Sequence, residues 1–181
     1  MRRKLKNREL GRIDAKAYKE LQKMPIILVL DNIRSLNNIG SLFRTADGMR
    51  IQGIYLCGIT ACPPHRDIQK TALGATDSVP WKYFDSTLEA MKELKSNGYK
   101  LIALEQVEGA VMLNDYMPSE QTQLAVIVGN EVKGVDDEVV NGVDLCIEIP
   151  QFGTKHSFNV TISAGIVLWD FCSKIGFDKF V

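Results

Sequence analysis

Short apolar runs recur along the chain and predict the strands of a sheet. Five of them cover residues 26–31, 53–57, 99–105, 124–129 and 145–150. Several are continuous rather than alternating, which is typical of strands that helices cover on both faces. We therefore expect a largely buried sheet.

Segments with helical spacing lie between these runs. Apolar residues recur at positions 39, 42, 43, 46 and 49, and again at 88, 91 and 94, where Asn97-Gly98 predicts a helix end. Residues 157–174 are apolar almost throughout, so this last helix should pack deeply or lie at a subunit interface. Strands that alternate with helices indicate an α/β fold with a mostly parallel sheet, whose ligands bind at the carboxyl ends of the strands.

Composition agrees with one globular domain. The chain has 181 residues, of which 45% are hydrophobic and 24% are charged, enough for a sizeable core. No run approaches the roughly 18 apolar residues of a membrane helix, and the N-terminus lacks the pattern of a signal peptide. We expect a soluble, cytoplasmic protein whose cysteines stay reduced.

The charge is unevenly distributed, although the net charge is zero. Residues 1–23 hold nine Lys or Arg (Arg8 among them) and three acids, so this segment carries +6 and the remaining chain −6. The composition changes near Met24-Pro25, which predicts a basic N-terminal extension, 1–24, and a domain, 25–181. Such an extension either contacts nucleic acid or is simply a solvated helix.

A zinc site is the first alternative that the sequence offers. Cys57, Cys62 and His65 are three potential ligands close together in the chain. No fourth ligand follows at a useful spacing, and structural zinc sites almost always have four. We therefore expect no metal site.

Polar and glycine residues follow three of the predicted strands. After the first strand come Asn37, Asn38, Gly40 and Arg44, in which an Asn pair at a helix start caps free amides and a glycine permits close approach of a ligand or backbone. The alternative is an ordinary helix cap followed by a surface arginine.

The other two clusters follow the strands at 124–129 and 145–150. Gly129, Asn130 and Glu131 leave the first of these strands, either as a cofactor contact or as a glycine-rich turn. Ser157 and Asn159 open the last helix, and capping accounts for one of them but not necessarily for both.

Together and in this order, the clusters resemble the three signature motifs of the SpoU family of RNA methyltransferases, a branch of the SPOUT superfamily, and most closely its TrmH-type members. The first motif matches at Asn38, Gly40, Arg44 and Thr45, the second at 129–131, and the third at 149–150 and 157–160. The resemblance extends over residues 26–170. One position departs from the family pattern: Phe158 replaces a more frequent Leu, which should reshape the adenine pocket slightly.

The resemblance implies an α/β fold with a C-terminal trefoil knot. It also implies transfer of a methyl group from S-adenosylmethionine to a ribose 2′-hydroxyl of tRNA or rRNA, without a metal. The implied cofactor-binding residues are Leu104, Gly129, Ile149 and Phe158. The implied catalytic positions are Asn38, Arg44, Glu131, Ser157 and Asn159.

Within this implied site, Arg44 should grip a phosphate or stabilise an oxyanion, because an arginine with a pKa above about 12 is a poor general base. Glu131 should orient Arg44 or Asn38. The resemblance further implies a homodimer with residues of both subunits near each site, and the helix at 158–171 is the expected interface. The basic extension, with Arg66, Lys70 and Lys155, should follow RNA phosphates.

Three other functions remain open at this point. They are a catalytically inactive RNA-binding relative, a SPOUT enzyme that methylates a base, and a flavodoxin-like or nucleotide-binding module. Stabilisation by S-adenosylmethionine or S-adenosylhomocysteine, but not by flavin or ATP, would distinguish the methyltransferases from the last of these.

Overall fold

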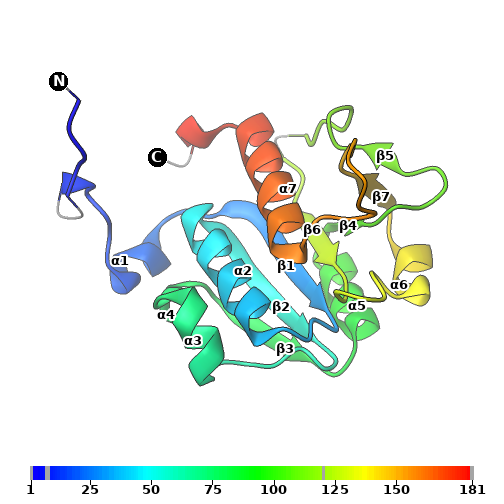
Figure 1. The fold of residues 1–181 in the computed structure, drawn as a ribbon, viewed down its shortest axis with the longest axis horizontal. Coiled ribbons are helices and arrows are strands. Elements are labelled where there is room, and N and C mark those ends of the chain that lie inside the picture. The colour runs from blue at the N-terminus through cyan, green and yellow to red at the C-terminus, as the bar shows by residue number, and fades with distance from the viewer. Residues whose placement is uncertain (1, 7–8, 120, 180–181) are drawn as a thin grey trace.

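A seven-stranded, wholly parallel sheet forms the centre of the molecule in the computed structural model, which describes residues 2–6, 9–119 and 121–179 (Figure 1). The strands lie in the order β3-β2-β1-β6-β4-β7-β5. Their bounds are β1 Met24–Asp31, β2 Ile51–Cys57, β3 Trp81–Phe84, β4 Lys100–Leu104, β5 Val111–Met112, β6 Leu124–Val128 and β7 Leu145–Glu148.

Helices cover both faces of this sheet. On one face lie α1, α2, α3, α4 and α7, with α2 and α7 side by side, and on the other lie α5 and α6. Their bounds are α1 Ala15–Glu20, α2 Leu36–Gly48, α3 Arg66–Ala72, α4 Ala75–Ser78, α5 Thr87–Ser96, α6 Asp137–Gly142 and α7 Val160–Ile175, followed by the 3-10 turn η2 Phe177–Lys179.

The strand β1 shows why the apolar runs are continuous. Its Leu28 and Leu30 pack with α2 and α7, while Ile27 and Val29 pack with α5 on the opposite face. Successive side chains of a strand point to opposite faces, so a strand between two helical layers must be apolar at every position. The prediction of a buried parallel sheet is confirmed.

All five predicted strands exist, and the structure has two further strands that were not predicted. The strand β3 is largely exposed, and β5 has only two residues, also exposed. Neither has the buried apolar run by which the other strands were recognised. The short helices α3, α4 and α6 were missed as well, because four to seven residues are too few to establish a helical period.

Two helix starts also differ from the prediction. The helix predicted at 39–49 begins earlier, at Leu36, because Ser35 caps it by accepting the amide hydrogen of Asn38. The last helix begins at Val160 rather than at 157, because Asn159 is its N-cap. The Asn37-Asn38 pair therefore lies inside the first turn of α2 and is not its cap.

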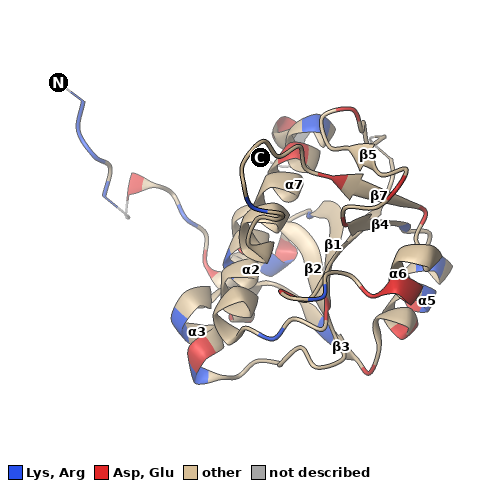
Figure 2. Cartoon of the chain, turned by 45° about the vertical axis from the view of Figure 1, so that its right-hand side comes forward, with Lys and Arg blue, Asp and Glu red and all other residues tan. Residues whose placement is uncertain are grey.

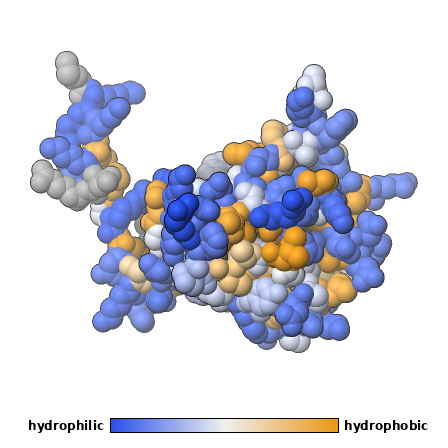
Figure 3. Space-filling view, turned by 60° about the horizontal axis from the view of Figure 1, so that its bottom comes forward, coloured by the Kyte–Doolittle hydropathy of each residue, from blue (hydrophilic) through white to orange (hydrophobic). Residues whose placement is uncertain are grey.

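The basic extension is joined to the domain through α1. The side chain of Tyr18 is 4% exposed and belongs to the main core, with the ammonium group of Lys23 lying 4.2 Å from its ring centroid. The first described residues, 2–6, reach away from the domain and are largely hydrophilic (Figure 3), whereas residues 10–14 lie beside the end of α2. Arg8 lies outside the described residues. Among the described helices, none is long and apolar enough to cross a membrane.

Candidate functional site

The three polar clusters lie beyond the carboxyl ends of β1, β6 and β7. Because all strands are parallel, these ends meet at one edge of the sheet, where loops of the chain far apart in sequence come together. In Figure 1 the start of α2, the loop after β6 and the start of α7 are found at this edge.

Glu131, in the loop after β6, connects the second cluster to the first through hydrogen bonds. Its carboxylate accepts the backbone amides of Arg34 and Ser35, each at 3.0 Å, and the side-chain amide of Asn38 at 2.9 Å. Burial acts to raise the pKa of Glu131, but the hydrogen bonds from Arg34, Asn38 and Ser35 outweigh it, so the pKa is lowered from its ordinary value. The carboxylate is therefore held in its charged form.

Asn38 extends this connection to the third cluster. Its side-chain oxygen faces the side-chain amide of Asn159 at 3.5 Å, the longest contact of the series. Asn159 in turn accepts the amide hydrogen of Thr161 at 2.9 Å and so caps α7. Glu131, Asn38 and Asn159, one residue from each cluster, thus form a single chain of polar contacts. Ser157 is exposed and makes no hydrogen bond within the described residues.

Asn130 shapes the loop that carries Glu131. Its backbone exchanges two hydrogen bonds with Gly134, both at 2.9 Å, and its side-chain amide donates to the carbonyl of Asn32 at 2.8 Å. Gly129 is required here because a Cβ at this position would overlap the backbone of Gly134 and Val135. Asn130 was not among the predicted site residues, although it stands between two that were.

A cavity of about 80 Å³ opens where β4 and β7 end. Three predicted cofactor residues line it, namely Leu104, Ile149 and Phe158, together with Ser157. The lining that sequence reasoning missed consists of Glu105, Gln106, Ile147, Glu148, Gln151 and Ser163. Most of these lie at or beside the end of a predicted strand, and that position is the signal by which they could have been found. Gly129 is not part of this lining, so its contact with a cofactor stays a prediction.

Glu105 gives this cavity a fixed rim. Its two carboxylate oxygens accept the backbone amides of Val135 at 2.9 Å and Gln106 at 3.0 Å. Another part of the lining, Gln151, Ser157 and Phe158, comes from the loop 151–159, in which most residues are exposed and Phe152 is 97% exposed. The cavity therefore has one rigid wall and one wall with few contacts.

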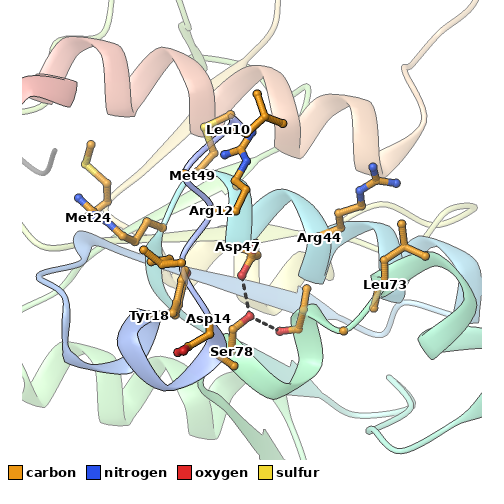
Figure 4. Close-up of a pocket in the computed structure, with 18 of the residues that line it drawn as sticks. Leu10, Arg12, Asp14, Tyr18, Met24, Arg44, Asp47, Met49, Leu73 and Ser78 are labelled. Carbon is orange, nitrogen blue, oxygen red and sulfur yellow. Dashed lines mark hydrogen bonds between the residues drawn. The ribbon is translucent and has the colours of Figure 1, made fainter. Parts of the chain in front are cut away.

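Arg44 lies apart from this cavity. It is exposed on α2 and lines a second, larger hollow of about 1110 Å³ beside α1 and the turn after α3 (Figure 4). Its side chain has no hydrogen-bond or ion-pair partner in the part of the chain that is described. Glu131 thus orients Asn38 and not Arg44.

Gly40 has a packing role. A Cβ at this position would overlap the side chain of Thr71 and the carbonyl of Ile68, so the glycine allows α3 to lie directly against α2. The sequence suggested that Gly40 allows either a ligand or a backbone segment to come close. The structure shows that the backbone of α3 comes close.

The residues of the zinc alternative have other roles. Cys57 lies in the core, where burial raises the pKa of its thiol to about 12 and so keeps it neutral. The Nδ1 of His65 accepts the amide hydrogen of Asp67 at 3.2 Å and caps α3. Among residues 2–6, 9–119 and 121–179, no group of three or more His, Cys, Asp or Glu side chains is placed to hold a metal ion.

Comparison with known proteins identifies the family. The model of the SpoU rRNA methylase family matches residues 25–169. The chain belongs to the SpoU family. This SpoU protein is 30% identical over 148 residues to the 23S rRNA (guanosine-2′-O-)-methyltransferase RlmB of Neisseria meningitidis serogroup B, a match that covers 82% of the chain and 58% of the relative. The SpoU chain therefore spans less than two thirds of the length of that relative.

Solved structures agree with this family in their fold. The TrmH/SpoU tRNA modifying enzyme of A. aeolicus has a TM-score of 0.79 at 22% identity, covering 92% of this SpoU protein and 82% of that chain. The AdoMet-bound rRNA methyltransferase of Sinorhizobium meliloti has a TM-score of 0.74 at 24% identity, covering 86% and 58%. The expected α/β fold of the knotted SpoU type is thus confirmed.

Proposed function

We propose that this SpoU protein transfers a methyl group from S-adenosylmethionine to a ribose 2′-hydroxyl of tRNA or rRNA. One observation carries the proposal: Glu131, Asn38 and Asn159 join the three motif loops into one polar chain at the edge of the sheet that also holds the Leu104 cavity. Similarity to a ribose methyltransferase, which the chain covers only in part, gives further support.

The residues around the cavity suit the cofactor chemically. Leu104, Ile149 and Phe158 offer apolar contact to an adenine ring, and Glu105 and Gln151 offer polar groups at its edge. At about 80 Å³ the cavity is smaller than the roughly 300 Å³ of a typical ligand pocket. We therefore expect the weakly held loop 151–159 to move outward when the cofactor enters.

The chemistry assigns clear tasks to the side chains. When bound, S-adenosylmethionine supplies an electrophilic methyl group to the ribose oxygen. Arg44 stays protonated and is suited to hold an adjacent phosphate or the oxygen as it gains negative charge. Glu131 holds Asn38, and through it Asn159, at a fixed place beside the substrate.

A homodimer would bring Arg44 to the cavity. Within one subunit Arg44 and the Leu104 cavity line separate hollows. On α7, Ile162 and Trp169 are 54% and 56% exposed, and they lie seven residues apart on one side of the helix. Burial of this apolar side against a second subunit, as expected for 158–171, would let each subunit supply Arg44 to the other.

Basic side chains on the surface provide a path for RNA phosphates. The basic side chains of the extension that the structure describes are exposed or partly exposed, and so are Arg66, Lys70 and Lys155. Figure 2 shows Lys and Arg positions in blue along the extension and on α3. The proposal includes a cytoplasmic location, because tRNA and ribosomes function in the cytoplasm. The basic extension, 1–24, is in this proposal a substrate-binding addition to the methyltransferase domain, 25–181.

The decisive experiment identifies the methylated nucleoside. Purified protein and radiolabelled S-adenosylmethionine are incubated with total tRNA and, separately, with rRNA from cells that lack the gene, and the RNA is digested to nucleosides. Label in a 2′-O-methylnucleoside is the expected result. Label on a base would refute ribose methylation, and the absence of label in both RNAs would refute the proposed activity.

A further inference from the structure

The hollow beside Arg44 contains more arginines than the motif supplies. It lies between the extension, the carboxyl-terminal half of α2 and the turn that joins α3 to α4, and it measures about 1110 Å³. Its charged lining consists of Arg12, Arg44 and Arg50 with Asp14 and Asp47, a net charge of 3 − 2 = +1.

The two acids of this hollow are already engaged. Asp14 accepts the amide hydrogen of Ala17 at 2.7 Å as the N-cap of α1, and Asp47 accepts the hydroxyl of Ser78 at 2.6 Å. None of the three guanidinium groups has a hydrogen-bond or ion-pair partner in the described residues. The two carboxylates therefore form hydrogen bonds within the protein, and the guanidinium groups are available to bind a ligand.

The arginines come from different elements but face one space. Arg12 belongs to the extension and Arg44 to α2, and Figure 4 shows both side chains reaching to the same side of the hollow. A guanidinium presents a planar fork of donors that matches two oxygens of a phosphate. Two such forks, supplied by different elements but reaching to the same side, are suited to successive phosphates of one polyanionic strand.

We infer that this hollow holds RNA backbone, with Arg12 and Arg44 gripping phosphates of the same strand. The extension then forms one wall of the substrate site and is not a separate RNA-binding segment. The inference rests on the proposed function, because it takes RNA as the substrate, and it adds Arg12 as a positioning residue. Arg12 acts on the strand and not on the reacting atoms, so it should affect affinity for RNA before it affects turnover.

The test compares two charge-removing substitutions on the extension. Arg12→Gln removes a guanidinium from the hollow, whereas Lys16→Gln removes a charge from an exposed residue of α1 that does not line it. Affinity for bulk tRNA and for rRNA is measured by filter binding in the presence of S-adenosylhomocysteine, over a range of salt concentrations. Affinity for S-adenosylhomocysteine itself is measured separately by calorimetry.

The expected result is selective. Arg12→Gln should weaken RNA binding roughly tenfold at low salt and lower the slope of log affinity against log salt by about 0.7 to 0.9, the value for one lost phosphate contact. Lys16→Gln should change affinity far less, and cofactor affinity should be unchanged in both. Arg12→Lys should restore the salt slope but only part of the affinity, since it keeps the charge and loses the fork.

A double variant tests whether both arginines hold one strand. The effects of Arg12→Gln and Arg44→Gln on RNA affinity should be non-additive if they grip neighbouring phosphates. Equal effects of Arg12→Gln and Lys16→Gln would overturn the inference while leaving methylation by the unsubstituted protein intact. Absence of RNA binding by the unsubstituted protein would overturn the proposed function as well.

Discussion

At the scale of single residues, the carboxylate of Glu131 organises the site. It accepts three hydrogen bonds from the segment that opens α2, two of them from backbone amides that precede the helix. A carboxylate is needed here because every partner is a donor, and an amide side chain has only one accepting atom. Through Asn38 the same group reaches Asn159 and the start of α7.

Glu131→Gln should therefore reduce activity far more than stability. We expect methyl transfer to fall by roughly 100-fold, the cost of a small misplacement of reacting groups. The site is partly exposed, so the free energy of unfolding should fall by only about 1 kcal/mol. Glu138→Gln, at an exposed position of α6, is the matched control, and equal activity in the two variants would contradict the assigned role.

The lowered pKa of Glu131 predicts how this stabilisation depends on pH. A carboxyl whose pKa is depressed in the folded state stabilises it above the ordinary value of 4.5, and the contribution disappears as the pH falls through the folded pKa. The difference in melting temperature between the protein and Glu131→Gln should thus be full at pH 7 and shrink at pH 3. A difference that stays constant between these values would show that Glu131 does not titrate as proposed.

Arg44 should serve the substrate rather than the cofactor. It does not line the Leu104 cavity of its own subunit. Arg44→Ala is therefore expected to lose turnover by at least about 100-fold, as for removal of one oxyanion-stabilising donor, while its affinity for S-adenosylhomocysteine stays unchanged. Calorimetry and a methyl-transfer assay measure the two effects. Loss of cofactor binding would mean that Arg44 supports the pocket instead.

At the scale of elements, two loops of the site differ in how firmly they are held. The loop after β6 closes on itself through Asn130 and Gly134, and its neighbour Glu105 fixes Val135. The loop 151–159 is mostly exposed. A rigid loop can position a bound ligand, and a loosely held loop beside it can move when the ligand enters and leaves.

Two glycine substitutions measure this difference. Gly129→Ala should destabilise the protein by about 1–3 kcal/mol, because the added methyl overlaps backbone that cannot turn aside. Gly153→Ala should stay within about 0.5 kcal/mol, because nothing lies within 4 Å of the added Cβ. Denaturant unfolding of the two variants gives both numbers, and equal destabilisation would show that the loops are held alike.

At the scale of the whole molecule, the homodimer that we propose would complete each site from a second subunit. In this proposal the exposed apolar side of α7 forms the contact, and Arg44 is the residue that each subunit would supply to the other. In a two-fold symmetric dimer of identical subunits, each subunit would supply its Arg44 to the other, so the two sites would be equivalent.

Mixing two inactive variants tests this arrangement. Arg44→Ala subunits are combined with Ile149→Asp subunits, in which a charge occupies the cavity. Random exchange should restore about a quarter of the sites if each site uses Arg44 of the other subunit, since half of the dimers are mixed and each holds one intact site. Activity that stays at the level of the separate variants would place Arg44 and the cavity in the same subunit's site. Trp169→Glu should abolish both dimerisation and rescue.

The sequence by itself determined the fold class, the central strands and the family. Apolar runs at five strands are dictated by burial on both faces, and the three motifs keep their order along the chain. Apolar runs and short motifs are local features of the sequence. They can be recognised because burial and turn geometry restrict which residue types occur at each position. Asn38, Glu131 and Asn159 were predicted, and the structure brings them together.

Only the tertiary structure decided which of these residues meet. It showed that Glu131 holds Asn38 rather than Arg44, that Arg44 shares a hollow with Arg12, and that Glu105 forms the cavity rim. These pairings join segments up to about a hundred residues apart, as from Asn38 to Glu131. No local pattern encodes them, because a contact across the sheet depends on strand order and on which loops the parallel strands bring to the same edge.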